Sequence, residues 1–355
     1  MKKLIVLKLL ILIIVFGCTD KSKVSTSLWS LDLDNITLEN LKTPHYLLSD
    51  EGIVLYSNKK LIKADTNLDK IFWENSLGKN LYTTHIKQLG TEILVCGFYN
   101  NRSYLYFIDD ESGQINSIDT FSSVIESLYQ IEASSNFIIY QQNIREEPYV
   151  LELSEYNYKT KKSLWKVEGM PLFTQPYVDS NYLVFPKTNA SAACVNRISK
   201  VSTEFPIESK DTFALIEQLN KTEKWQLVNL INGEIDTRLI WDFKFELDGS
   251  VYVAKIDDNK LYQVSLNSGN TTPFVELPDN ILSGTSYGTN ILLYLGKKNV
   301  ALVDVLTQKV EFKELEFEPL LVEDAFSLQK ERVFYYTKKE NTEKEEYKIL
   351  GEIIN

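Results

Sequence analysis

Few residues in this chain have the types and spacing that metal chemistry requires. The two histidines, His45 and His85, each lie near the start of an apolar run, in "TPHYLL" and "TTHIKQL". If both runs border one opening, the two imidazoles could share a metal ion, but such a site needs a third ligand and no residue marks one. We therefore interpret both histidines as hydrogen-bonded structural residues and expect no metal.

Two pairs of neighbouring carboxylates are the other candidates for catalysis: Asp109 and Asp110 in "FIDDESG", and Asp257 and Asp258 in "KIDDN". General acid–base chemistry needs carboxylates held in a pocket. Both pairs instead lie in expected turns, where aspartate commonly bonds the backbone. The chain also has no GxSxG, GxGxxG or GxxxxGK[ST] motif. We expect no catalytic residue, no cofactor and no enzyme activity, a degenerate propeller enzyme being the least favoured alternative.

The three cysteines indicate no zinc or haem site, because no CxxC motif or Cys/His cluster is present. Cys96 and Cys194 lie in apolar settings, "ILVCGF" and "SAACVN". They could form a disulfide in an exported protein or remain two separate buried thiols, and the sequence leaves both possibilities open.

The N-terminus has the layout of a secretory signal. Lys2 and Lys3 precede an apolar stretch, 4–16, interrupted only by Lys8. Thirteen positions are too few for a membrane-spanning helix, which needs about 20 residues, but suit the apolar core of a signal peptide. An uncleaved helix is disfavoured by the polar residues that follow at 19–21.

The third cysteine ends this stretch, in Val15-Phe16-Gly17-Cys18, which resembles the bacterial lipobox. The resemblance implies cleavage between Gly17 and Cys18 and a lipid on the Cys18 thiol. The expected organisation is a lipoprotein signal peptide (1–17), a lipidated cysteine and polar tether (18–27) and one folded domain (28–355). An ordinary cleaved signal with a chance cysteine is the alternative.

Charge disfavours nucleic acid as a partner. The formal net charge is −11, and removing the three lysines of 1–17 makes it −14 (−11 − 3). No stretch is strongly basic, whereas neutralising phosphates takes clusters of lysine and arginine.

Short runs rich in β-branched and aromatic residues, bounded by polar turns, recur throughout the domain and predict an all-β fold. Many are followed by alternating apolar residues, a polar turn and a further run, as in "LYFIDDESGQINSI" and "LVNLINGEIDTRLIW". Each such unit predicts a hairpin.

The hairpins repeat at a regular spacing. The expected turn positions are separated by 44, 48, 72, 36, 39 and 43 residues and are Asp69, Gly113, Lys161, Gly233, Gly269, Gln308 and Gly351. A weak copy at 197–200 would divide the longest step. If 187–209 is not such a copy, it is a surface loop. A period near 40 with four strands per unit is typical of a β-propeller, here of seven or eight four-stranded blades; a pair of sandwiches is the alternative.

The last copy ends soon after its expected turn, so its outermost strand would be missing. The segment "SLWSLDL" (27–33) resembles "SLWKVEG" of another repeat, and we expect it to supply that strand and to protect the sheet edge. Four tryptophans then recur as blade-packing residues, with stacking on a ligand as the alternative: Trp29, Trp73, Trp165 and Trp241.

The hairpins resemble the repeats of pyrroloquinoline-quinone-like propellers, through Gly113, Gly233 and Gly269 in the turns and the aromatic endings "IFW", "SLWKV" and "LIW". The layout is similar to that of the lipoprotein of the outer-membrane β-barrel assembly machinery. This resemblance implies a monomeric, lipid-anchored propeller of the cell envelope, with the outer membrane favoured. We expect a non-catalytic scaffold for an envelope protein partner. The alternative is a solute- or glycan-binding lipoprotein that uses the central channel.

Overall fold

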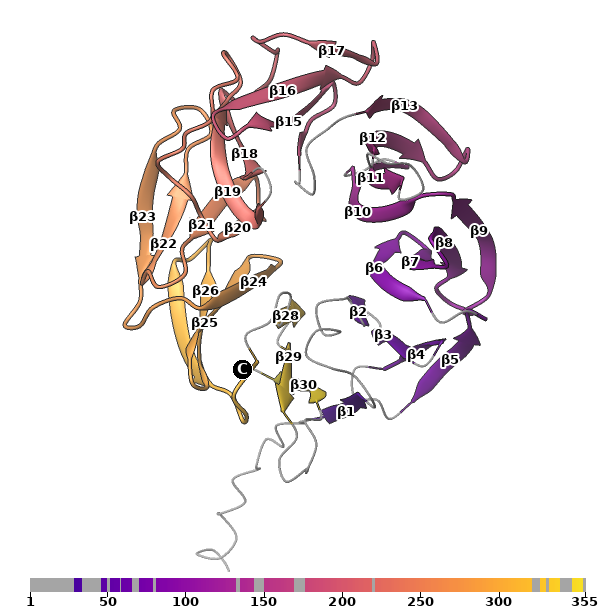
Figure 1. Cartoon of the computed structure of the whole chain (residues 1–355). Coiled ribbons are helices and arrows are strands. Elements are labelled where there is room, and N and C mark those ends of the chain that lie inside the picture. The colour runs from indigo at the N-terminus through magenta and orange to yellow at the C-terminus, as the bar shows by residue number, and fades with distance from the viewer. Residues whose placement is uncertain are drawn as a thin grey trace, which may run out of the picture.

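The computed structural model describes residues 29–33, 46–49, 52–57, 59–65, 70–78, 81–131, 135–143, 150–168, 176–218, 221–320, 326–329, 332–338 and 347–353. Every helix or strand element in these ranges is a β-strand. The strands form eight hydrogen-bonded sheets, seven with four strands and one with two. Figure 1 shows the sheets standing side by side in a ring, each with its first strand toward the centre. The prediction of an all-β propeller built from four-stranded sheets is confirmed, and the sandwich alternative is wrong.

The sheets are numbered first to eighth in chain order. Their strands are β2 (Tyr46–Ser49), β3 (Gly52–Ser57), β4 (Lys60–Ala64) and β5 (Ile71–Ser76); β6 (Tyr82–Leu89), β7 (Glu92–Tyr99), β8 (Arg102–Asp109) and β9 (Ile115–Phe121); β10 (Val124–Gln130), β11 (Asn136–Asn143), β12 (Val150–Asn157) and β13 (Lys162–Glu168); β14 (Tyr177–Val178), β15 (Tyr182–Thr188), β16 (Ser191–Asn196) and β17 (Val201–Thr203); β18 (Phe213–Gln218) and β19 (Lys221–Asn229); β20 (Phe243–Leu247), β21 (Ser250–Ala254), β22 (Lys260–Val264) and β23 (Thr271–Glu276); β24 (Ser283–Tyr287), β25 (Asn290–Gly296), β26 (Asn299–Asp304) and β27 (Lys309–Glu314); and β28 (Phe326–Gln329), β29 (Arg332–Lys338), β30 (Tyr347–Ile353) and β1 (Trp29–Leu33).

The position of a strand in its sheet follows from its residue pattern. The middle strands β7 and β8 are buried along almost their whole length, because neighbouring sheets cover both of their faces. The outermost strand β9 alternates between partly buried and exposed residues, as expected for a strand with one face toward solvent.

The hydrophobic core lies between neighbouring sheets. One cluster joins Val54 of the first sheet to Ile93 and Tyr106 of the second. Another contains Leu292 of the seventh sheet and Tyr335 of the eighth, and it continues to Ile53 of the first. The apolar core is therefore continuous across the junction between the two ends of the chain. Complete burial of such side chains contributes roughly 1.5–3 kcal/mol each.

The two ends of the chain also meet in one sheet. β1 pairs antiparallel with β30 over five residue pairs, with Trp29 opposite Gly351. Figure 1 shows β1 beside β30, next to the first sheet. The expected hairpin turn at Gly351 is wrong, since Gly351 lies inside β30 and pairs with Phe334 of β29 as well. The strand continues through this glycine because it has a partner on each side.

The other described turn positions agree with the predicted spacing. Gly113, Lys161, Gly233, Gly269 and Gln308 all have positive φ, between 57° and 74°. This conformation favours glycine, so the lysine and the glutamine adopt a backbone geometry that their residue types do not indicate. Asp69 lies outside the described residues.

The irregular segment 187–209 is part of a degraded sheet and not simply a surface loop. β16 and β17 form a hairpin around Arg197–Lys200, with Lys200 at φ 64°. β17 has only three residues and pairs with 194–196. The weak repeat copy predicted there is confirmed.

Candidate functional site

A pocket of about 720 Å³ opens between the fourth and fifth sheets. It exists because β17 is short and leaves residues 191–193 of β16 without an outer neighbour in their own sheet. The next hairpin of the chain bonds there instead: Ala192 N–H donates to the Gly233 carbonyl at 2.8 Å, and Ile235 N–H donates to the Ala190 carbonyl at 3.1 Å. The two sheets are held together beside the space that the missing strand residues would fill.

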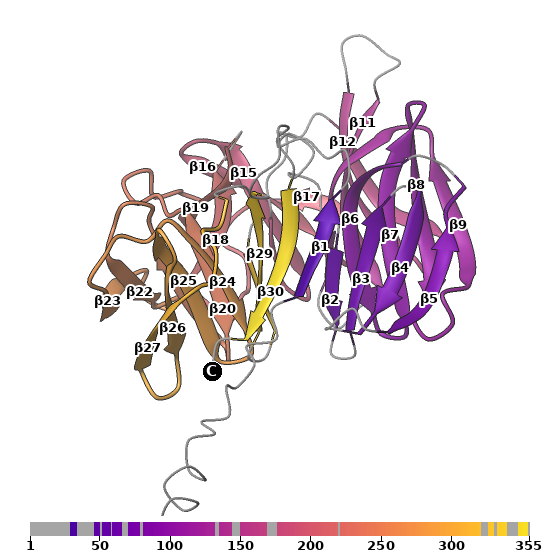
Figure 2. The same cartoon turned by 90° about the horizontal axis from the view of Figure 1, so that it is seen from below.

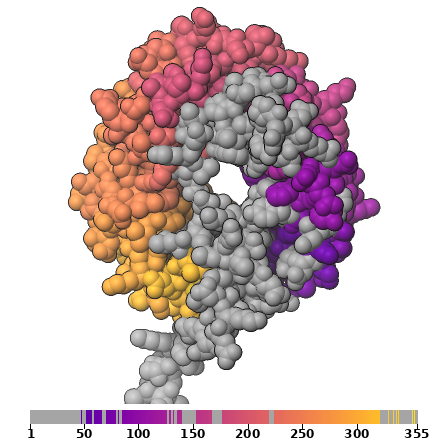
Figure 3. All heavy atoms as spheres, in the orientation of Figure 1, coloured from indigo at the N-terminus to yellow at the C-terminus, as the bar shows by residue number. Residues whose placement is uncertain are grey.

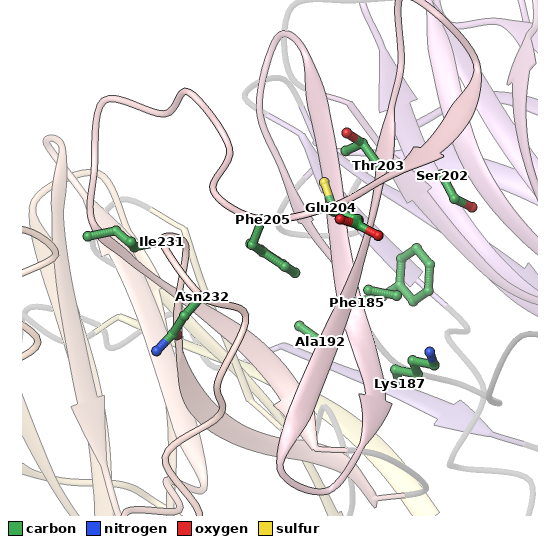
Figure 4. Close-up of a pocket in the computed structure, with 11 residues that line it drawn as sticks. Phe185, Lys187, Ala192, Ser202, Thr203, Glu204, Phe205, Ile231 and Asn232 are labelled. Carbon is green, nitrogen blue, oxygen red and sulfur yellow. The ribbon is translucent and has the colours of Figure 1, made fainter.

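The pocket has apolar walls and a few polar groups. Figure 4 shows Phe185, Ala192, Phe205 and Ile231 on its sides, with Lys187 and Glu204 among the polar residues. The remaining lining residues are Ala193, Cys194, Ser202, Thr203 and Asn232. An apolar space with a few polar groups is typical of sites that bind small molecules or an inserted side chain.

The one thiol in the pocket is not activated. Cys194 is buried, and burial raises the pKa of its thiol to about 12, with a smaller contribution from the charge of Asp179. A reactive cysteine needs a lowered pKa, because the thiolate is the nucleophile. Neither Cys96 nor Cys194 forms a disulfide, so the disulfide alternative is wrong.

Trp73 of the first sheet lies against the turn of the second. A Cβ atom on Gly113 would come within 2.5 Å of the Trp73 ring, so only glycine allows this close approach. The Trp73 Nε1–H donates to the Asp110 carbonyl at 2.8 Å. The buried Lys63 ammonium lies 2.7 Å from the Asp110 carboxylate.

A buried ion pair with the charges exchanged joins the third sheet to the fourth, and here the tryptophan bonds within its own sheet. The buried Glu155 carboxylate accepts hydrogen bonds from Arg197 Nη2 at 2.9 Å and Nε at 3.2 Å. Trp165 Nε1 and Asn136 Nδ2 donate to it at 2.8 and 2.6 Å. Burial by itself raises the pKa of Glu155, but the bonds and charge of Arg197, helped by Asn136 and Trp165, hold it below its usual range.

The other two predicted blade-packing tryptophans, Trp241 and Trp29, have surroundings different from those of Trp73 and Trp165. Trp241 is buried and forms an isolated bridge with Trp225, its ring centroid 5.1 Å from that of Tyr262. Its Nε1 atom has no hydrogen-bond partner in the described part of the chain. Trp29 begins β1.

The two histidines cannot be compared, since His45 lies outside the described residues. His85 lies on β6, the innermost strand of the second sheet, beside an irregularity in the pairing with β7. Burial, with a smaller effect of Lys87, lowers its pKa to about 3, so the imidazole is neutral. Within the described ranges its Nδ1 has no hydrogen-bond partner, so the expected hydrogen bond is missing at this atom.

The aspartate pairs serve the turns, as expected. Asp109 accepts from the Ser112 backbone N–H at 2.8 Å and from its hydroxyl at 2.6 Å, and these bonds lower its pKa. Asp257 has positive φ, and Asp258 accepts from the Tyr262 hydroxyl. No group of three potential metal ligands occurs among the described residues.

The predicted cleavage and lipidation residues, Gly17 and Cys18, lie outside the described residues. Among the helices and strands that are described, no helix has the length and apolarity needed to cross a membrane.

Comparison with known proteins identifies the fold but no family. No family model matches the chain, and no curated protein does. The computationally designed Ika8 protein is similar in structure, with a TM-score of 0.58 at 10% identity over 87% of this chain and 95% of that chain. The C-terminal WD40 domain of Sif2 has a TM-score of 0.51 at 11% identity over 85% and 93%.

BamB from Moraxella catarrhalis is also among the structural matches, with 10% identity over 86% of this chain and 81% of that chain. Its TM-score of 0.41 is below those of Ika8 and the Sif2 domain. The comparisons therefore show a β-propeller, a fold that hosts many unrelated functions.

Proposed function

We propose that this chain is a lipid-anchored β-propeller of the cell envelope that acts as a non-catalytic scaffold for a protein partner. The ring consists of eight blades, with β18 and β19 as the reduced fifth blade and β1 as the strand that closes the eighth. Trp73 and Trp165 hold successive blades together through Asp110 and Arg197, and Trp29 and Trp241 are assigned the same packing role. Such a ring is a rigid support for binding.

The observation that carries the binding role is the pocket between the fourth and fifth sheets. It has apolar walls, it lies beside the short outermost strand β17, and it contains a protonated thiol in place of a nucleophile. A pocket of this kind accepts an anchoring side chain of a partner, the type of contact that concentrates binding energy in protein interfaces.

Filling the pocket tests this role. A Thr203→Trp variant places a large ring in the pocket. Thr272→Trp places the same ring on the outer strand β23, away from the pocket, and serves as the matched control. Pull-downs from detergent-solubilised membranes should recover a reproducible partner with the parent chain and the control and lose it with the pocket variant. Equal recovery with both variants would refute the pocket as the contact site.

A second candidate function, binding of a solute or glycan, is favoured by the opening at the centre of the ring in Figure 3. It predicts no reproducible protein partner and an increase in melting temperature with specific glycans. Thermal-shift measurements on the parent chain therefore distinguish the two functions.

The anchor is tested separately. The lipobox-like residues support removal of residues 1–17 and acylation of Cys18, with the outer membrane as the favoured location. A Cys18→Ala variant should move from the detergent phase to the aqueous phase in Triton X-114 partitioning, whereas Cys96→Ala, which alters a buried cysteine outside any disulfide, should not. An N-terminal peptide without acyl groups in the parent protein would refute the anchor.

A further inference from the structure

The turns between the third and fourth strands of the sheets lie on one face of the ring, together with the turns between the first and second strands. Backbone hydrogen bonds join the two kinds of turn within a sheet: Asp110 N–H donates to the Thr91 carbonyl at 2.9 Å, and Val305 N–H donates to the Thr289 carbonyl at 2.9 Å. We call this side the turn face and define it by the described residues of the turns between third and fourth strands, which are 65, 70–71, 109–115, 157–162, 196–201, 229–235, 265–271 and 304–309. In Figure 2 the hairpin between β26 and β27 marks it at the lower edge of the disc.

Aliphatic side chains are concentrated on the turn face. The five most exposed large apolar side chains of the described residues all lie there: Ile198 at 72%, Leu306 at 62%, Ile71 at 59%, and Ile231 and Val201 at 58% each. Asparagine or aspartate side chains cap the turns of Ile198, Ile231 and Leu306 by accepting from their backbone N–H groups. These bonds hold the three residues at the tips of their turns.

The exposed charged residues of the turn face are mostly basic, although half-buried aspartates also lie there and Lys161 and Lys309 pair with Asp119 and Glu311. The chain has 38 basic and 49 acidic residues. The exposed charged residues of the turn face are six lysines, Lys70, Lys159, Lys161, Lys162, Lys200 and Lys309, and two acids, Glu111 and Glu234. Lysine with exposed aliphatic residues is the composition of surfaces that bind anionic lipid headgroups and insert apolar groups between them.

The chain also enters the fold at this face. An outermost strand such as β27 begins at the turn face, and β1 takes the outermost position in the eighth sheet, antiparallel to β30. Trp29 therefore lies at the turn face, toward which β30 points in Figure 2. Trp29 lies eleven positions after Cys18 (29 − 18), and such a segment spans at most about 40 Å when extended.

We infer that the turn face lies against the membrane surface, with its aliphatic tips inserted among the headgroups and its lysines on anionic lipids. This inference rests on the proposed anchor, which leaves the chain at this face. The aliphatic tips belong to the first, fourth, fifth and seventh sheets. Tips spread around the ring fit a surface as wide as the disc, whereas the contact residues that dominate a protein interface cluster at its centre.

Site-specific fluorescence tests the orientation. Residues 18–355, which contain every described strand, are attached by an N-terminal histidine tag to vesicles of phosphatidylethanolamine, phosphatidylglycerol and a nickel-chelating lipid. Cys18→Ser is combined with Ile198→Cys or with Ile256→Cys, and the new thiol carries an environment-sensitive dye; Ile198 does not line the pocket. Ile256 is the matched control, since it is exposed and lies between β21 and β22, on the opposite face of the disc.

The dye at position 198 should shift its emission to the blue and be quenched by spin-labelled lipid, while the dye at 256 should behave as it does without vesicles. Equal behaviour at the two positions would overturn the inference. Because the tag attaches the protein to the vesicles, the dye result does not depend on acylation of Cys18. Acylation is tested separately by the mass of the N-terminal peptide isolated from native membranes.

A second measurement needs no dye. Replacing Ile198 and Leu306 together by serine should weaken binding of the untagged chain to the same vesicles by roughly tenfold or more, equivalent to about 1.4 kcal/mol. An unchanged melting temperature shows that the variant folds. Unchanged vesicle binding by the folded variant would contradict the inference.

Discussion

Replacing Arg197 by methionine removes the cation from a buried ion pair and leaves the Glu155 carboxylate without its main partner. Glu155 is 2% exposed, and the Arg197 side chain is 11% exposed, so water cannot replace the lost charge. Breaking such a pair by removing one member costs about 3–5 kcal/mol. We expect the free energy of unfolding of Arg197→Met to fall by roughly this amount at neutral pH.

The loss should depend on pH in a defined direction. The pKa of Glu155 lies below its usual range in the folded parent chain. Its contribution to stability is therefore present above the ordinary glutamate pKa of about 4.3 and disappears as the pH falls through the folded-state value. Without Arg197 the folded-state pKa of Glu155 rises, because burial raises it and the bonds and charge of Arg197 no longer lower it. The difference between the parent chain and the variant should therefore be largest near neutral pH and shrink on acidification.

Urea unfolding followed by tryptophan fluorescence measures this difference. Arg238→Met is the matched control, since Arg238 pairs with Asp236 with 86% of its side chain exposed and should leave the midpoint unchanged. Combining Glu155→Gln with Arg197→Met should recover most of the loss, because no buried charge remains. The reasoning would be refuted if Arg197→Met lost no more than the control, or if its deficit were the same at every pH.

Three further outcomes follow from the turns, the eighth sheet and the pocket. Gly249→Ala, at φ 70° with open space around it, should cost roughly 1–2 kcal/mol. Gly113→Ala, at φ 71°, should cost more in urea unfolding, since its Cβ would meet the Trp73 ring; equal costs would exclude the contact as a source of stability. Burial raises the pKa of Glu352, so its contribution to stability declines as pH rises. Glu352→Gln should therefore be more stable relative to the parent chain at neutral pH than near pH ~4; the opposite trend in urea midpoints would contradict the shift. The native Cys194 thiol should react with iodoacetamide far more slowly than after unfolding, as mass spectrometry can show, and rapid native modification would contradict its burial.

The spacing of the turns predicts the ring because each repeat of the sequence forms one sheet. The residues that form such a sheet lie close together in the sequence, so the repeat is visible there. It locates Lys161 and Gln308 as turn residues although neither is glycine. It also indicates the weak copy at 197–200. Gly351 shows its limit, since a strand partner more than 300 residues away decides that this glycine lies in a strand.

The ion pairs between sheets could not be predicted from the sequence because they join residues of different repeats. One signal was available. Lys63 precedes Trp73 by ten residues, and Glu155 precedes Trp165 by ten, so each charge occupies the same place relative to its tryptophan on the third strand of a sheet. A buried charge at such a position demands a partner, but only the packed sheets show that Asp110 and Arg197 supply it. The pocket could not be predicted from the sequence either, because it results from the three-residue length of β17.

The pairing of β1 with β30 makes the N-terminal part of the domain the last to complete its structure. Trp29 and its partner Gly351 are 322 positions apart (351 − 29), so during synthesis β1 waits for almost the entire chain before it can form its hydrogen bonds. Contacts between such distant residues form slowly. A chain cut short before residue 347 would keep its first strand unpaired, and quality-control proteases could then distinguish incomplete from complete molecules by the segment closest to the proposed lipid.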